Sequence, residues 1–301
     1  MNSLRGRRLV IFGCGYVGTA VTREALALGM QVEALTRNPE RAVALADLGV
    51  RTLTADLAAV SWHELIAPGP EFVLNCVSSG GWGMEGYQRS YVDGMRSILG
   101  WARRGAVGTL VYTSSTSVYP QTGGRVVDET ASTEGVGESR RILIEAEAML
   151  REASSVCDRW FILRLAGIYG PGRHHLLDQI RNGATELPGS GSHRLNLAHR
   201  DDIVAAILAA FASPSSVGNR IFNVTDDIAA KKAEVVRWLA VKVGRMPPRF
   251  SGGAASTRGG FAGPADRLIS NARLKAELGW QPKYPSFREG YTNVLQITER
   301  H

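Results

Sequence analysis

The chain has 301 residues, a formal net charge of +7 and 44% hydrophobic residues. This length is enough to bury the core of one large domain or of two modest ones. No apolar run approaches the ~18 residues that a membrane helix needs. The apolar run near the N-terminus is also too short for the core of a signal peptide. We therefore expect a cytoplasmic protein with no membrane segment.

The positive charge raises the question of nucleic-acid binding. Five of the 35 basic residues are lysine, so arginine accounts for the other 30, and these are scattered along the chain. There is no block of basic residues, no interleaving of basic and aromatic residues, and no known nucleic-acid motif. Anionic small-molecule sites explain the charge better, and we expect no nucleic-acid partner.

The three cysteines are too widely spaced for a disulfide framework or a metal site, and no metal is expected.

The first predicted element is a short apolar strand at residues 9–12, and it runs directly into a glycine-rich turn. The sequence GCGYVG at residues 13–18 fits the pattern G-x-G-x-x-G, and a helical pattern follows it. In such a turn Gly13 permits the tight bend, Gly15 lets a pyrophosphate approach the backbone, and Gly18 lets the helix pack closely on the sheet. A glycine turn without a ligand is the alternative. The strand before and the helix after favour a dinucleotide site.

The second predicted strand, at 31–35, ends where the cofactor ribose is recognised in such folds. A carboxylate here would accept hydrogen bonds from a ribose 2′-hydroxyl. Arg37 instead suits a 2′-phosphate, because a guanidinium pairs well with phosphate. Arg41 adds to the same positive field, whereas Glu33 lies inside the strand and is a poor choice for the ribose acid. An ordinary solvated arginine is the alternative, and NADP is favoured over NAD.

Strands and helices alternate through the first two hundred residues. Four further strands are predicted, at residues 50–53, 72–77, 109–113 and 160–163. The segments between them carry apolar residues at helical spacing. This alternation predicts an α/β fold with a Rossmann-type, doubly wound parallel sheet.

Beyond residue 164 the regular alternation ends. Two segments, at 183–192 and 247–264, are rich in Gly, Pro and Ser. Between them we predict helices at 201–211 and 231–243 and a strand at 221–224. We predict a dinucleotide-binding Rossmann domain and a smaller C-terminal substrate lobe. The domain comprises residues 1–165, with 197–226 returning to it, and the lobe comprises 166–196 and 227–301. Residues 251–263 are predicted to form a mobile loop that closes over substrate.

Four later segments carry a family resemblance. They are VYTSSTSVY at 111–119, LRLAGIYGPG at 163–172, LAHRDDIVAA at 197–206, and SNARL at 270–274 with LGWQP at 278–282. In this order they resemble motifs of the extended short-chain dehydrogenase/reductases, the NAD(P)-dependent epimerase/dehydratase-like family. The resemblance implies a nicotinamide cofactor and a small-molecule substrate such as a nucleotide sugar. Whether the protein forms a homodimer is left open.

The chain departs from this family at the catalytic pair, a tyrosine four residues before a lysine. In that pair, positive charge lowers the tyrosine pKa so that the phenol can move a proton. The first lysine of this chain is Lys231, so the pair is absent from the helix after the fifth strand. Aligning Glu145 with the acid that follows the family's lysine puts Arg141 at the lysine position and Gly137 at the tyrosine position. The chain therefore resembles the family's atypical branch. Its glycine motif also differs from the usual G-x-x-G-x-x-G.

The resemblance implies roles for a few polar residues. Ser115 matches the hydroxyl that orients substrate, and Arg141 keeps positive charge near the nicotinamide ribose and a developing oxyanion. Arginine cannot donate a proton at neutral pH, so the acid comes from elsewhere. Tyr119 completes our expected catalytic set, with Tyr87, His174, His193 and His199 as the alternative acids.

The expected cofactor contacts lie mainly at the ends of the early strands. They are Gly13, Gly15, Tyr16, Val17, Gly18, Arg37, Asn38, Asp56, Leu57, Val77, Ser78 and Arg141.

Two functions remain open. The first is an NADP-dependent oxidoreductase or epimerase-like enzyme for a nucleotide-sugar-like or other small hydroxy/carbonyl substrate. The second is a non-catalytic NADP-binding redox sensor. The retained lobe with its LGWQP segment favours the enzyme, because a lobe of this kind binds a substrate.

Overall fold

A seven-stranded parallel sheet forms the centre of the computed structural model, which describes residues 4–79, 83–153, 155–252 and 265–298. Its strand order is β12-β7-β5-β4-β1-β2-β3. The strands are β1 Arg8–Phe12, β2 Gln31–Thr36, β3 Arg51–Thr54, β4 Phe72–Asn75, β5 Val107–Ser115, β7 Cys157–Leu165 and β12 Arg220–Val224. The order reverses direction at β1, as a doubly wound sheet requires. The predicted Rossmann-type fold is confirmed.

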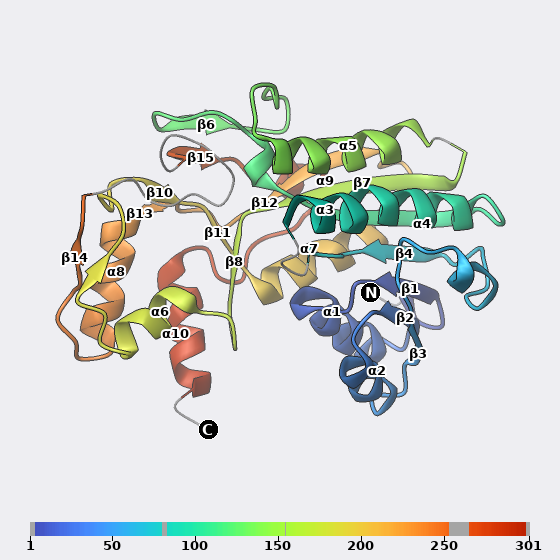
Figure 1. The fold of residues 1–301 in the computed structure, drawn as a ribbon, viewed down its shortest axis with the longest axis horizontal. Coiled ribbons are helices and arrows are strands. Elements are labelled where there is room, and N and C mark those ends of the chain that lie inside the picture. The colour runs from blue at the N-terminus through green and yellow to red at the C-terminus, as the bar shows by residue number, and fades with distance from the viewer. Residues whose placement is uncertain (1–3, 80–82, 154, 253–264, 299–301) are drawn as a thin grey trace.

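Helices cover both faces of this sheet (Figure 1). One face carries α1 Tyr16–Ala27, α2 Pro39–Ala46, α7 Arg200–Ala212 and α9 Ala272–Leu278, and the other carries α4 Gly94–Ala102 and α5 Glu138–Glu152. Alternate side chains of each strand point to opposite faces, so both sets are buried. In β1, Ile11 packs with α1 and α7, whereas Phe12 packs on Trp62 with ring centroids 5.0 Å apart.

A helical stretch connects β4 to β5 and packs on the second face of the sheet. It begins with α3 Gly83–Tyr87, continues through the π-helical turn η3 Gln88–Asp93, and ends with α4. A π-helical turn inside an α-helix often marks a functional site. Both α3 and η3 contact α5, and α5 contacts the short helix η4 Thr116–Val118 that follows β5. These contacts gather α3, η3, α5 and η4 near the carboxyl end of β5.

The smaller lobe is built from three helices and short strand pairs. They are α6 His175–Arg181, α8 Lys232–Lys242 and α10 Phe287–Thr298, with β9 Glu186–Leu187 paired to β14 Arg249–Phe250 and β10 Arg194–Leu195 paired to β13 Ala230–Lys231. Figure 1 shows this lobe to the left of the sheet. Its separate core contains Leu177, Val236 and Phe287. The lobe therefore stands beside the sheet as a second packed unit.

Part of the segment predicted as lobe packs against the Rossmann domain instead. Leu274 of α9 and Trp280 lie in the core that contains β1, and the Trp280 indole nitrogen donates to the Asp202 carbonyl at 3.1 Å. In a separate two-stranded sheet, β15 Arg267–Ile269 pairs with β6 Arg125–Val127. Hydropathy shows that a short helix has an apolar face but not which core receives it. Of the loop predicted at 251–263, residues 253–263 lie outside the described residues.

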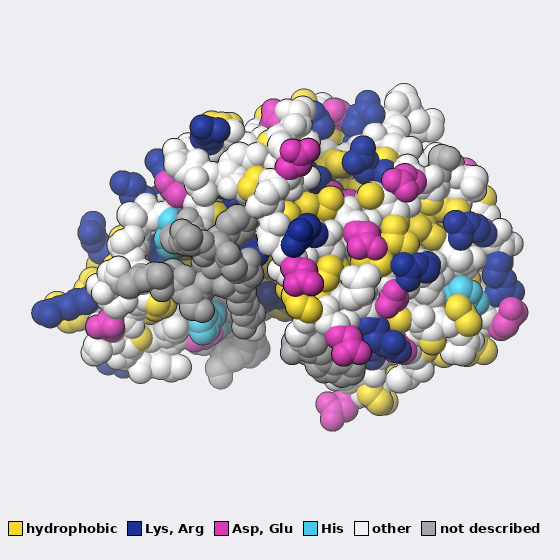
Figure 2. Space-filling model, turned by 45° about the horizontal axis from the view of Figure 1, so that its top comes forward, with side chains coloured by type: hydrophobic (Ala, Val, Ile, Leu, Met, Phe, Trp, Pro, Cys, Tyr) yellow, Lys and Arg dark blue, Asp and Glu magenta, His cyan; other side chains and the backbone are white. Residues whose placement is uncertain are grey.

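The surface carries both signs of charge. On the face shown in Figure 2, basic and acidic side chains are interspersed over the larger domain. Ion pairs of the protein include Arg104 with Glu64 and Arg220 with Glu277. Across the described part of the chain, no helix combines the length and apolarity needed to cross a membrane.

Candidate cofactor and active site

The glycine turn after β1 has the form of a cofactor cradle. Gly13 has a φ of 93°, and a Cβ added there would lie 2.6 Å from the backbone nitrogen of Val77. A Cβ on Gly18 would lie 2.5 Å from the Gly13 carbonyl oxygen. Gly15 differs, because nothing lies within 4 Å of a Cβ added there. Two glycines are thus required by close backbone packing, and the third leaves open space beside the start of α1.

The start of α1 offers backbone donors to an anion. Gly15 occupies the N-cap position and no side chain caps the helix, so its first N–H groups are available. Val17 is buried, and only its backbone can face a ligand. The open space at Gly15 and these donors fit a dinucleotide pyrophosphate, the group for which the motif was predicted.

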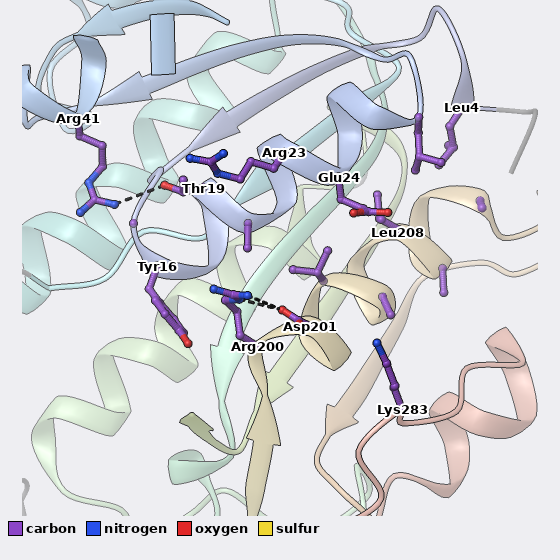
Figure 3. Close-up of a pocket in the computed structure, with 17 residues that line it drawn as sticks. Leu4, Tyr16, Thr19, Arg23, Glu24, Arg41, Arg200, Asp201, Leu208 and Lys283 are labelled. Carbon is purple, nitrogen blue, oxygen red and sulfur yellow. Dashed lines mark hydrogen bonds and ion pairs between the residues drawn. The ribbon is translucent and has the colours of Figure 1, made fainter. Parts of the chain in front are cut away.

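Tyr16 ties this turn to the segment that leads into the smaller lobe. Its hydroxyl donates to the Pro171 carbonyl at 2.9 Å. The guanidinium carbons of Arg173 and Arg200 lie 5.6 and 5.5 Å from its ring centroid. Figure 3 shows Tyr16 and Arg200 side by side, with Arg200 bonded to Asp201. Positive charge therefore accumulates next to the N-terminus of α1.

The residues predicted to select the cofactor lie just past β2 and β3. Arg37 and Asn38 are exposed, and the Asn38 side chain caps α2 by accepting from the Arg41 backbone at 2.9 Å. Burial alone would raise the pKa of Asp56. Hydrogen bonds from Arg89 and from the backbone, together with the charges of Arg89 and Arg37, bring it below its usual value instead. Arg37 thus lies within electrostatic reach of Asp56.

The other predicted cofactor contacts divide between core and edge. The Leu57 side chain is buried in the core on the α4 side of the sheet. Val77 is half-buried directly beside Gly13, and Ser78 is exposed. The carboxyl ends of β1 and β4, which are neighbours in the sheet, thus bring Gly13, Val77 and Ser78 to one edge.

Ser115 and Tyr119 lie close in sequence but in different environments. Ser115 is half-buried at the end of β5, and its Oγ accepts from the Ser117 backbone at 3.1 Å, which leaves its hydroxyl hydrogen able to donate. The Tyr119 phenol is fully buried. It donates to Asn223 Oδ1 at 2.9 Å and accepts from Arg164 Nη1 at 2.9 Å, and burial raises its pKa. This places Tyr119 in the framework beneath the site, with its proton already committed, in contrast to the catalytic role expected for it.

The acidic anchor of α5 is Glu147 rather than Glu145. Glu147 is buried and accepts hydrogen bonds from the Ser114 hydroxyl and the Arg164 guanidinium, whereas Glu145 is exposed. The alignment that put Arg141 at the lysine position rested on Glu145. Aligned on Glu147 instead, the positions of the dyad fall on Ser139 and Leu143, so a tyrosine and a lysine are absent in either register.

The orientation of α5 also decides which arginine faces inward. Arg140 lies seven residues before Glu147, on the same helix face, and is 9% exposed. Arg141 is exposed, and its predicted contact with the nicotinamide ribose stays a prediction. Burial lowers the pKa of Arg140, and the nearby Tyr87 opposes that effect. Tyr87 is half-buried, with its ring centroid 5.3 Å from that of Tyr91.

Arg267, which sequence analysis missed, supports the loop after β5. Its Nη1 donates to the Tyr119 carbonyl at 2.7 Å and its Nη2 to the Thr116 carbonyl at 2.9 Å. Burial and the charge of Arg140 lower the pKa of Arg267 to about 10. The spacing from Glu147 could have indicated Arg140. No pattern in the sequence signals Arg267, because β15 meets β6 only in the folded chain.

Two of the predicted histidines are engaged elsewhere. His199 is fully buried with its ring centroid 4.0 Å from that of Tyr284, and burial lowers its pKa to about 4. The imidazole is therefore neutral at physiological pH. His174 Nδ1 lies 2.7 Å from an Asp178 oxygen. No group of His, Cys, Asp and Glu side chains that could hold a metal ion occurs within the described ranges.

A groove of about 710 Å³ runs from the glycine turn along α1 and α7. Figure 3 shows Arg41, Arg23 and Arg200 around it, and Ala205, Leu208 and Ala209 are among its apolar lining residues. Neither Ser115 nor Arg140 lines it. The groove therefore lies beside the cradle and away from the end of β5.

Comparison with known proteins identifies the family. A family model described as "NAD dependent epimerase/dehydratase family" matches residues 9–225. This chain belongs to that family. The family assignment and the fold together support a nicotinamide dinucleotide as its cofactor.

Three curated relatives of this epimerase/dehydratase chain are informative. It is 30% identical over 195 residues to Protein YeeZ of Escherichia coli K12, covering 65% of each chain, just under two thirds of YeeZ's length. It is 28% identical to a 3-diazoavenalumate denitrifying reductase of Streptomyces, over 94% of this chain and 98% of that one. It is 27% identical to a 2-alkyl-3-oxoalkanoate reductase of Stenotrophomonas maltophilia, over 78% of this chain and 75% of that one.

Solved structures agree on the fold. A UDP-glucose 4-epimerase of Thermotoga maritima superposes with a TM-score of 0.83 at 15% identity, covering 97% of this chain and 99% of that one. A dTDP-glucose 4,6-dehydratase of Streptomyces venezuelae superposes with a TM-score of 0.82 at 19% identity, covering 98% and 97%. At these identities the likeness shows the fold of the epimerase/dehydratase family and no more.

Proposed function

We propose that this protein is an NADP(H)-dependent oxidoreductase that acts on a small hydroxy/carbonyl compound. The observation that carries the proposal is the cradle formed by Gly13, Gly15 and Gly18, with open space only at Gly15. The two relatives that align with more than 70% of the chain are both named reductases, which favours net reduction.

Selection of NADP rests on Arg37 at the end of β2. Its guanidinium is exposed at the position where a ribose 2′-substituent is recognised. A 2′-phosphate would gain charge-assisted hydrogen bonds there. Asp56, an acid within electrostatic reach of Arg37, is bonded to Arg89 and so is less able to accept from a 2′-hydroxyl.

The reaction site lies between the end of β5 and the first turn of α5. When bound, NADPH would supply the hydride that adds to the carbonyl carbon of the substrate. The Ser115 hydroxyl donates a hydrogen bond to the carbonyl oxygen, and the Arg140 guanidinium stabilises negative charge that develops there. Tyr87, the half-buried phenol within electrostatic reach of Arg140, donates the proton that the oxygen then takes up. Solvent returns that proton to Tyr87.

The test combines a binding measurement with turnover. We expect NADPH binding in a fluorescence titration, NADPH oxidation with a panel of 3-oxo acids, and the reverse reduction of NADP+ with the corresponding hydroxy acids. Nucleotide sugars are tested with both forms of the cofactor. Tyr87→Phe lowers turnover at least about tenfold while NADPH affinity stays within twofold. Sugar interconversion without net NADPH oxidation would favour an epimerase. Tight NADPH binding with no turnover on any substrate would favour the redox sensor.

A further inference from the structure

The outer face of α7 is apolar, and part of it is open to solvent. Every side chain from Ile203 to Ala212 is apolar. A helix that is apolar all round is normally covered on every side. The inner side of α7, which carries Ile207 and Phe211, packs in the core, whereas Ala205 and Ala212 on the outer side are exposed. An apolar ligand would complete the burial of this helix.

The groove beside the cradle provides space for such a ligand. It lies between α1 and α7, whose first residues are in contact, with the Arg200 guanidinium carbon 5.5 Å from the Tyr16 ring centroid. The lining residues extend from Gly15 to Leu28 and from Arg200 to Ala212, so the groove follows both helices along their length. Its volume of about 710 Å³ falls within the roughly 300–1,000 Å³ of small-molecule sites.

The two ends of the groove differ in polarity. Arg41 and Arg200 line it near the start of the helices, and Arg41 is bonded to Thr19 of α1. Figure 3 shows the Arg23 side chain extending back toward Thr19, the usual direction for a side chain on a helix. At the other end the lining is mainly aliphatic and includes Leu4, Leu28, Leu208 and Ala212. One end therefore suits an anionic group and the other an alkyl chain.

The lining as a whole carries an excess of positive charge. It contains four cationic side chains and two acidic ones, which leaves two positive charges in excess. Asp201, one of the two acids, is bonded to Arg200 at 2.8 Å. Charge complementarity therefore favours an anion. The aliphatic end disfavours a ligand that is charged throughout, because burying a charge there is costly.

We propose that this groove binds an amphipathic anion, a single alkyl chain ending in a carboxylate, at a site separate from the cofactor cradle. The chain lies on the outer face of α7, and Arg23 pairs with the carboxylate. Arg23 comes eight residues after Gly15, about 12 Å along α1, so the first-turn N–H groups stay available for the pyrophosphate. A free alkanoate fits better than a membrane surface, because the apolar residues line a recess and do not project as on a membrane-binding helix.

The experiment compares decanoate with two partial analogues. Decanol keeps the chain without the charge, and acetate keeps the charge without the chain. We expect calorimetric titration to show decanoate binding at least tenfold more tightly than either. Ala205→Trp fills the groove from an exposed position and weakens decanoate binding at least tenfold. Arg23→Gln also weakens decanoate binding at least tenfold and leaves decanol binding unchanged.

Matched controls use exposed residues outside the groove. Ala46→Trp on α2 and Arg237→Gln on α8 leave decanoate affinity within twofold. Circular dichroism and melting temperature show whether each variant folds. Arg23→Gln changes a solvent-exposed side chain, so it keeps the test decisive even if Ala205→Trp is unstable. Decanol binding as tight as decanoate binding, or equal losses in the controls, would overturn the proposal.

Further measurements separate this site from other uses of the same face. Saturating NADPH changes decanoate affinity by less than about threefold, and displacement of decanoate by NADPH would make the groove part of the cofactor site. Phosphatidylglycerol vesicles that bind the parent protein but not Ala205→Trp would assign the face to a membrane. A change in oligomeric state with Ala205→Trp would assign it to a second copy of the chain. Each of these three results would overturn the proposal. Arg23-dependent decanoate binding in a protein that does not bind NADPH would support the site and refute the proposed oxidoreductase.

Discussion

Glu147 of α5 and Arg164 of β7 form a buried, bidentate ion pair. Arg164 Nε and Nη2 donate to the two carboxylate oxygens of Glu147 at 3.0 and 2.6 Å, and both side chains are at most 5% exposed. The Ser114 hydroxyl donates to the same carboxylate at 2.6 Å. This pair fixes how α5 is rotated against the sheet. It thereby decides that Arg140 faces inward and Arg141 outward.

Removing one partner of that pair should destabilise the protein strongly. Glu147→Ala leaves the Arg164 charge buried without a partner, which costs about 3–5 kcal/mol of unfolding free energy. Urea denaturation followed by circular dichroism measures this loss. Glu145→Ala, two residues away on the exposed face, should change stability by less than about 0.5 kcal/mol. Equal effects of the two changes would contradict the assignment of Glu147 as the anchor.

Cofactor preference should depend on Arg37. We expect NADPH to bind at least about tenfold more tightly than NADH, a difference of about 1.4 kcal/mol. Arg37→Asp should reverse or abolish this preference, because a carboxylate repels the 2′-phosphate and accepts from a 2′-hydroxyl. Fluorescence titration with both cofactors measures the two affinities. Equal affinities in the parent protein would rule out a 2′-phosphate site at Arg37.

Two glycines of the turn should respond differently to the same substitution. Gly15→Val should fold normally and lose most cofactor affinity, because its side chain would enter the open space beside α1. Gly18→Val should lower the melting temperature, since its Cβ would lie 2.5 Å from the Gly13 carbonyl oxygen. Thermal unfolding and NADPH titration on both variants separate the two effects. Unchanged NADPH binding by Gly15→Val would mean that the turn does not hold a pyrophosphate.

The two neighbouring arginines of α5 should differ in their effect on turnover. Arg140→Gln should reduce kcat/KM for the best substrate by about tenfold to a thousandfold, because it removes charge that stabilises the developing oxyanion. Arg141→Gln tests the earlier expectation that Arg141 contacts the nicotinamide ribose. We expect its effect to be smaller, since its side chain is exposed. If Arg141→Gln reduced kcat/KM more than Arg140→Gln, the contact of Arg141 with the nicotinamide ribose would be supported. The active site would then lie on the exposed face of α5.

Stability should fall as pH rises through the titration of Asp226. Burial raises the pKa of this carboxyl from 3.8 to about 8, and the nearby carboxylates of Asp227 and Asp202 add to the rise. Between those two values the native state holds a proton that the unfolded chain has released, so raising the pH weakens the native state. Asp226→Asn removes this dependence. The variant should therefore gain more than about 1 kcal/mol relative to the parent between pH 5 and pH 8 in urea denaturation. Parallel stability curves for the two proteins would contradict the raised pKa.

Local sequence determined the cradle and the sheet. The apolar strand, the three glycines and the following helix lie within twenty residues, and each depends on backbone conformation and hydropathy that a short segment already specifies. The alternation of strand and helix likewise predicted the parallel sheet, because the period of the apolar residues reports how each segment buries its side chains. Ser115 lies at the end of a predictable strand, but its role was inferred from the family resemblance of the segment at 111–119.

Only the tertiary structure decided which polar side chains meet. Arg140 and Arg141 look alike in the sequence, and the burial of Glu147 against Arg164 from a distant strand chooses between them. Tyr119 looks like a proton donor until Asn223 and Arg164, 104 and 45 residues away, take up its hydroxyl. Arg267 reaches the backbone of the loop after β5, at Thr116 and Tyr119, and β15, which carries it, pairs with β6. Such contacts depend on the rotation of helices and the pairing of strands far apart in the chain, and local sequence does not encode either.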